Sequence, residues 1–197
     1  MTRNRAILAA ASITAVLLVA GCDSDEPASP SPEPTQTSAS PEASATPSPS
    51  PTPTVKAPEP PKAMDDDGPA GAEAAAVYFL ELDPYIMKTG DTAEYEAMSH
   101  KTCDYCASRL DQAKQIAERG DIFTGGARSA RITQTYEQDS ATGIWPLDAR
   151  VDDKKSRITD SSGKVLLDTK ADVGDLRLEM TRKGDGWVVV GVADVPD

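Results

Sequence analysis

Two of the three cysteines, Cys103 and Cys106, have a spacing that suggests chemistry. Residues three apart on a helix have Cα atoms roughly 5 Å apart, a separation that a disulfide tolerates. Thiol–disulfide oxidoreductases use the same Cys-x-x-Cys spacing at a helix N-terminus, where it lowers the pKa of the first thiol. Their motif normally follows a strand, and no strand pattern precedes Cys103. We therefore expect a structural disulfide between the two cysteines, with redox activity as the alternative.

The single histidine, His100, lies three residues before Cys103. With the two cysteines it would supply three zinc ligands, whereas a structural zinc site uses four. It falls in the polar stretch 98–102 between predicted helices, where a solvated loop residue is more usual than a general base. The glycine pair at 125–126 lacks the lysine and the helix of a phosphate loop. The sequence thus predicts no catalytic residue, no metal site and no cofactor.

The third cysteine, Cys22, follows an export signal. Arg3 and Arg5 supply positive charge, and the apolar stretch 6–20 is shorter than the roughly 20 residues of a membrane span. The stretch ends in Leu-Val-Ala-Gly-Cys at 18–22, which resembles the lipobox of bacterial lipoproteins. This resemblance implies cleavage of residues 1–21 and lipidation of Cys22, and two acyl chains suffice for stable anchoring. We therefore predict a lipoprotein, bound to the lipid bilayer on the extracytoplasmic face of the cell membrane.

Residues 22–67 read as a disordered tether after the lipidated cysteine. The segment is rich in Pro, Ser, Thr and Ala and shows neither helical nor strand periodicity. Its prolines favour extended polyproline II conformations, which at ~3.1 Å per residue would reach on the order of 100 Å. The tether is expected to hold the domain at 68–197 away from the membrane.

The charge of the chain excludes one class of partner. The formal net charge is −12, and residues 68–197 carry 23 acidic against 16 basic residues. Nucleic-acid binding depends on neutralising phosphates with Lys and Arg, so we expect no nucleic-acid partner. The same acidity argues against a domain that lies flat on anionic lipid.

The first part of the domain is predicted to be helical. Residues 71–89 are apolar nearly all round. Asp83-Pro84 is expected to interrupt this helix and to begin a renewed helical segment, with a kink between the two parts. Residues 91–94 have capping-box spacing and open a short helix to about Met98. A third helix spans 103–119. Gly90 and Gly120 suit the C-terminal caps of the first and third helices.

The second part is predicted to form strands. Apolar and polar residues alternate after Gly125-Gly126 in the segments 130–136, 145–151 and 176–181, and apolar runs occur at 165–167 and 187–192. In the first of these segments Ala130, Ile132 and Tyr136 form the apolar face. Helices followed by an antiparallel meander define an α+β domain.

This order of elements resembles the cone-shaped domains named after nuclear transport factor two, also called SnoaL-like. More closely, Thr89-Gly90-Asp91, the cysteines at 103 and 106, Gly120 and Gly125-Gly126 resemble an uncharacterised family of actinobacterial lipoproteins over residues 70–195. The resemblance implies N-terminal helices packed on a curved antiparallel sheet and an extracytoplasmic location. It implies no established activity.

We expect a non-catalytic module of the cell envelope that binds an unidentified envelope protein or a small ligand. The alternative is an extracytoplasmic enzyme that uses the cone cavity, or the thiol–disulfide chemistry of Cys103 and Cys106. An enclosed cavity with two convergent ionisable groups would favour the enzyme, and a filled cone would argue against it.

Overall fold

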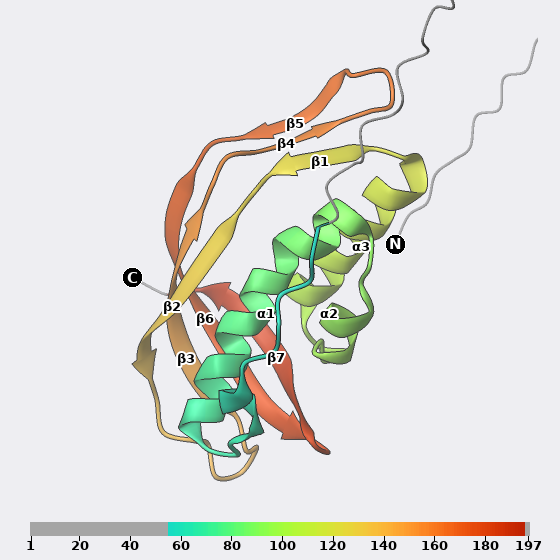
Figure 1. Cartoon of the computed structure of the whole chain (residues 1–197). Coiled ribbons are helices and arrows are strands. Elements are labelled where there is room, and N and C mark those ends of the chain that lie inside the picture. The colour runs from blue at the N-terminus through green and yellow to red at the C-terminus, as the bar shows by residue number, and fades with distance from the viewer. Residues whose placement is uncertain (1–54, 196–197) are drawn as a thin grey trace, which may run out of the picture. The chain divides into compact units, whose positions relative to one another are not determined.

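The computed structural model describes residues 55–195, and the predicted signal, Cys22 and most of the tether lie outside this range. A short 3-10 helix, η1 (Lys62–Asp65), precedes three helices, α1 (Pro69–Thr89), α2 (Ala93–Ala97) and α3 (Asp104–Arg119). Seven strands follow: β1 (Ile122–Gly125), β2 (Arg128–Thr135), β3 (Trp145–Asp153), β4 (Ser156–Thr159), β5 (Val165–Thr169), β6 (Asp172–Lys183) and β7 (Gly186–Asp194). Helices packed on a curved antiparallel sheet confirm the predicted α+β class (Figure 1). Within residues 55–195, none of the helices combines the length and the apolar character that a membrane crossing requires.

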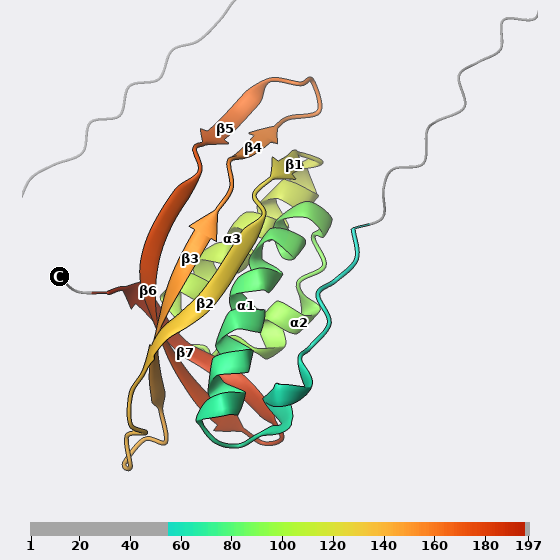
Figure 2. The same ribbon diagram turned by 60° about the vertical axis from the view of Figure 1, so that its left-hand side comes forward.

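The strands form two antiparallel sheets that follow one another along the chain. One sheet has the order β2-β3-β6-β7 and the other has the order β1-β4-β5. The chain passes directly from β1 into β2, from β3 into β4 and from β5 into β6, so the smaller sheet prolongs the larger one. We call the smaller sheet, β1-β4-β5, the arm. Figures 1 and 2 show the arm continuing the strands past the ends of α1 and α3.

Helix α1 fills the space between the larger sheet and the other helices. As its apolar composition predicts, it is buried on several sides, with Ala72, Ala75 and Phe79 fully inaccessible. The ring of Phe79 stacks on that of Tyr95 from α2, with 4.3 Å between ring centroids. From the sheet, apolar residues complete the core: Leu147, Ala149, Val151, Leu178, Met180, Trp187 and Val189. The interior of the domain is therefore packed with side chains.

The folded part begins earlier in the chain than the sequence predicts. Helix η1 lies within the segment assigned to the tether, and Met64 packs against the core. The indole Nε1 of Trp187 donates a hydrogen bond to the carbonyl oxygen of Met64 at 3.0 Å. This contact ties the end of the predicted tether to strand β7.

Two details of the predicted helices are wrong. Helix α1 continues through Pro84 without interruption, because Asp83 pairs with an arginine from α3 and does not cap a new helix. Helix α2 begins after Thr92, not Asp91, and Thr92 Oγ1 donates to Glu96 Oε1 in place of a capping box. The glycine caps are as predicted, with positive φ at Gly90 (70°) and Gly120 (67°).

The sequence also missed two strands and placed one side chain wrongly. Strands β1 and β4 have only four residues each, too few to show an alternating pattern. Strand β2 contains a register shift between Ile132 and Gln134. An extra residue reverses the faces beyond it, so Tyr136 lies exposed on the outer side and not in the core.

Candidate functional site

Cys103 and Cys106 form a disulfide, as the sequence predicts. Cys103 is the N-cap of α3, and its sulfur accepts a hydrogen bond from the backbone N–H of Cys106. Both residues are 1% exposed and belong to the core. A redox cysteine has to be reached by its substrate, so this burial fits a structural crosslink.

Loss of this crosslink is expected to cost about 2 kcal/mol, the value for closing so short a loop. The test is urea unfolding of the Cys103→Ala/Cys106→Ala protein against the wild type. Because the sulfurs are buried, we also expect the native protein to resist reduction. The test treats the folded protein with increasing amounts of reductant, alkylates the free thiols and measures the intact mass. Alkylation of both cysteines while the protein stays folded would favour the redox alternative.

His100 fixes the connection between α2 and α3 to the sheet. Its backbone N–H donates to the carbonyl oxygen of Val189, and the N–H of Val189 donates to the carbonyl oxygen of Met98. The His100 ring Nδ1 lies 2.7 Å from Thr102 Oγ1. No group of three His, Cys, Asp or Glu side chains in residues 55–195 is arranged to bind a metal ion. His100 therefore serves a loop contact.

The structure reveals a charged cluster that the sequence does not. Asp83 from α1 pairs with Arg109 from α3 through two hydrogen bonds of 2.6 and 2.7 Å. Arg128 from β2 pairs in the same two-bond manner with Asp153 from β3, at 2.6 and 2.9 Å. Arg128 also donates to the hydroxyl of Tyr105 at 3.0 Å and lies 3.5 Å from Asp83. We call these five residues the ion-pair cluster.

Burial sets the electrostatics of the cluster. Burial alone would lower the pKa of Arg109, but hydrogen bonds and attraction from Asp83 outweigh it and raise that pKa. The pKa of Arg128 is likewise raised, because Asp153 and Asp83 outweigh its burial. Tyr95 lies within the field of the cluster, and burial and then the charge of Asp83 raise its pKa. All three pKa values are shifted further above 7, so each group holds its proton at pH 7.

A cleft of about 240 Å³ opens beside the ion-pair cluster, between the helices and the base of the arm. Arg109 and Gln112 line its helical wall, and Phe123 and Leu167 line its wall on the arm. Lys154, between β3 and β4, and Lys170, between β5 and β6, lie where the arm joins the larger sheet. The lining also includes Asp83 and Asp153, which pair with arginines, and Asp172. Its apolar side chains and Lys170, which forms no ion pair within residues 55–195, suit a ligand with apolar and anionic parts.

A second charged group lies on the outer face of the larger sheet. Arg177 donates to both carboxylate oxygens of Asp148 at 2.8 and 3.0 Å, and the Tyr136 hydroxyl donates to the same carboxylate at 2.8 Å. The Arg177 guanidinium lies over the Tyr136 ring, 4.8 Å from its centroid. Asp148 and Arg177 are direct partners on β3 and β6, so this group stabilises the sheet.

The pair of Asp148 and Arg177 predicts that the free energy of unfolding falls at acidic pH. Hydrogen bonds from Arg177 hold the pKa of Asp148 below its ordinary value. A lowered folded-state pKa gives stability that is present above the ordinary aspartate pKa of about 4 and is lost as the pH falls through the lowered value. Urea unfolding from pH 6 to 2 should show this loss. In Arg177→Gln this loss of stability should be smaller. An unchanged loss would show that other carboxylates cause it.

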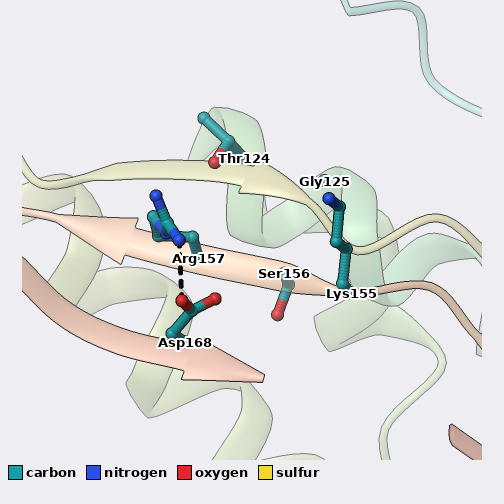
Figure 3. Close-up of a pocket in the computed structure, with 6 residues that line it drawn as sticks. All are labelled: Thr124, Gly125, Lys155, Ser156, Arg157 and Asp168. Atoms are coloured by element: carbon teal, nitrogen blue, oxygen red, sulfur yellow. Dashed lines mark hydrogen bonds and ion pairs between the residues drawn. The ribbon is translucent and has the colours of Figure 1, made fainter. Parts of the chain in front are cut away.

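A shallow hollow lies on the arm itself, lined by six residues: Thr124, Gly125, Lys155, Ser156, Arg157 and Asp168 (Figure 3). Arg157 pairs with Asp168 across β4 and β5 at 2.7 Å. Half of each of these two side chains is exposed, so the pair contributes little to stability. The Ser156 hydroxyl beside them hydrogen-bonds to Thr169 Oγ1 at 2.7 Å, and we assign the hollow no chemistry.

The fold and the site define a small α+β domain with a packed interior and a polar cleft at one end. The chain belongs to DUF6318, a family of unknown function, whose pattern matches residues 41–193. Like the actinobacterial family that the sequence resembles, DUF6318 has no established activity. Its lipoprotein character remains a prediction.

Solved structures show likeness at the level of the fold. The intermembrane space region of the chloroplast protein ARC6 aligns with a TM-score of 0.50 at 11% identity, covering 64% of this chain and 95% of that one. Aln2 from a Streptomyces species has a TM-score of 0.36 at 12% identity, covering 60% and 85%. A protein titled Rd1NTF2_05 with five substitutions has a TM-score of 0.34 at 12% identity, covering 59% and 90%. Among curated proteins, no significant match was found.

Proposed function

We propose that this protein is a lipid-anchored, non-catalytic binding module on the extracytoplasmic face of the cell membrane. The ion-pair cluster carries the proposal. Its carboxylates and guanidiniums pair with one another, and the core beneath it is filled by apolar side chains. A catalytic constellation needs reactive groups directed at a substrate, whereas these groups are already satisfied. The lipobox at Cys22 and the proline-rich segment after it support the location.

The cleft beside the cluster is the ligand site that we propose. Its helical wall is polar, and its wall on the arm carries the apolar Phe123 and Leu167 beside Ser156 and Thr169. Lys154 and Lys170 lie where the arm joins the larger sheet. A ligand that inserts an apolar group against Phe123 and places an acidic group near Lys170 would match this arrangement. An acidic peptide segment of an envelope protein and a small amphiphilic anion both have this chemistry.

Site-specific photo-crosslinking in intact cells tests this proposal. A photoreactive residue at Gln112, on the helical wall of the cleft, is expected to give a discrete adduct of the full-length protein. The same residue at Ala141, in the exposed turn between β2 and β3, is the matched control and should give none. Charge reversal at Lys170, to Glu, should weaken the Gln112 adduct. An adduct of equal strength from both positions, or none from Gln112, would contradict the cleft as a ligand site.

A further inference from the structure

The charge of the domain is unevenly distributed. The β4–β5 hairpin with its flanks, residues 154–170, contains five basic and two acidic residues. The rest of residues 68–197 contains 11 basic and 21 acidic residues. A positive segment therefore projects from a strongly acidic domain. Its basic residues are Lys154, Lys155, Arg157, Lys164 and Lys170.

Three of these lysines are not neutralised within the described part of the chain. Lys154 pairs with Asp152, and Arg157 pairs with Asp168. Lys155, Lys164 and Lys170 are exposed and form no ion pair within residues 55–195. These three ammonium groups are free to bind an anionic partner.

The same hairpin also exposes three large apolar side chains that lie outside the core. Val165 and Leu166 are each 46% exposed and Leu167 is 40% exposed, in consecutive positions of β5. Ile122 on the neighbouring β1 and Val173 at the start of β6 are at least half exposed. Residues 161–175 are exposed without a break. An exposed apolar run with polar residues around it is typical of a contact surface.

The form of β5 disfavours another strand as the partner. Strand β5 is the edge of the arm, and its pairing with β4 shifts register at Leu166. Bulges and lysines on an edge strand prevent the addition of a further strand, and Lys164 and Lys170 flank β5 on both sides. A partner that needs no strand register, such as a lipid surface, does not meet this barrier.

We propose that the β4–β5 hairpin binds the anionic phospholipid surface of the membrane that carries the lipid anchor. Lys155, Lys164 and Lys170 would contact lipid phosphates, while Val165 and Leu166 enter the headgroup region. This inference rests on the proposed extracytoplasmic membrane location. It reverses, for this one segment, the expectation that an acidic domain avoids anionic lipid. The tether would then allow a membrane-bound and a free position of the domain.

Fluorescence of the reconstituted full-length protein tests the contact. A Leu166→Cys variant carries one free thiol, because Cys103 and Cys106 are bonded and lipid blocks Cys22. A polarity-sensitive dye at this position should shift to the blue and be quenched by spin-labelled lipid in vesicles of phosphatidylglycerol and phosphatidylcholine. In phosphatidylcholine alone the effect should be lost. The same dye at Asp185→Cys, in the β6–β7 turn, is the positional control.

Charge variants supply the second measurement. Each lysine near an anionic surface strengthens binding about fivefold, so Lys155→Gln/Lys164→Gln/Lys170→Gln should weaken the contact about a hundredfold. Lys88→Gln/Lys101→Gln/Lys183→Gln removes three exposed lysines elsewhere and should change nothing. Equal quenching at Leu166→Cys and Asp185→Cys, or indifference to lipid charge, overturns the proposal. The anchor is judged separately, since an anchored protein floats with phosphatidylcholine vesicles whatever the hairpin does.

Discussion

Replacement of Asp83 by alanine is expected to lower the free energy of unfolding by about 3 kcal/mol. The carboxylate is 4% exposed and pairs with Arg109 through two hydrogen bonds. Its removal leaves the guanidinium of Arg109 without its partner in a mostly buried position and takes a neighbouring charge from Arg128. Urea unfolding followed by circular dichroism measures the change. For a domain of this size the midpoint of thermal unfolding should fall by about 10 °C.

The matched control is Asp168→Ala, which removes a carboxylate from an exposed pair on the arm. Arg157 and Asp168 are each about half exposed, so this substitution should cost less than about 1 kcal/mol. A second variant separates pairing from packing. Asp83→Ala/Arg109→Met removes both charges and should recover part of the loss, because no unpaired charge stays buried. Similar losses in Asp83→Ala and Asp168→Ala would show that the cluster contributes no more than a surface ion pair.

The features that sequence predicts well here are those with local causes. A glycine at the end of a helix can adopt positive φ at little cost, so Gly90 and Gly120 mark the helix ends correctly. The three-residue spacing of Cys103 and Cys106 brings the sulfurs together within one turn of a helix, whatever the rest of the chain does. These predictions required only neighbours in the sequence.

The ion-pair cluster could not be predicted in this way. Its members come from α1, α3, β2 and β3, and the partner of Asp83 lies 26 residues away. The local pattern gave a competing explanation, since an aspartate before a proline is a common start of a helix. The structure favours the long-range pair because the polar side chain at a buried position of α1 has to be satisfied. Knowledge of which strand packs against α1 would have been needed.

The net charge of the whole domain does not reveal the positive charge of the β4–β5 hairpin. Over residues 68–197 acids exceed bases by seven, and this balance led us to expect that the whole domain avoids anionic lipid. Five of the sixteen basic residues lie in the β4–β5 hairpin and its flanks, and this part of the arm extends past the helices (Figure 2). Net charge describes the field at a distance, whereas binding at a surface depends on the charges within a Debye length of about 10 Å.

Replacement of Cys22 by alanine is expected to change membrane association from salt-resistant to salt-extractable. The wild type would be held by two acyl chains, which high salt does not release. Without them only the lysines and apolar residues of the β4–β5 hairpin would remain, and salt screens that contact. Fractionation of cells with and without a high-salt wash measures the difference. Ser24→Ala leaves the lipobox intact and is the matched control.

Combining Cys22→Ala with the three hairpin substitutions, at Lys155, Lys164 and Lys170, should place the protein in the soluble fraction without any salt wash. The two contacts act through different forces, so each can be lost alone. A Cys22→Ala protein that stays with the membrane after the high-salt wash would contradict lipid anchoring at this cysteine. A Cys22→Ala protein that is soluble before any wash would leave the anchor standing and count against the hairpin contact, because the lysines would then add no measurable affinity for the bilayer.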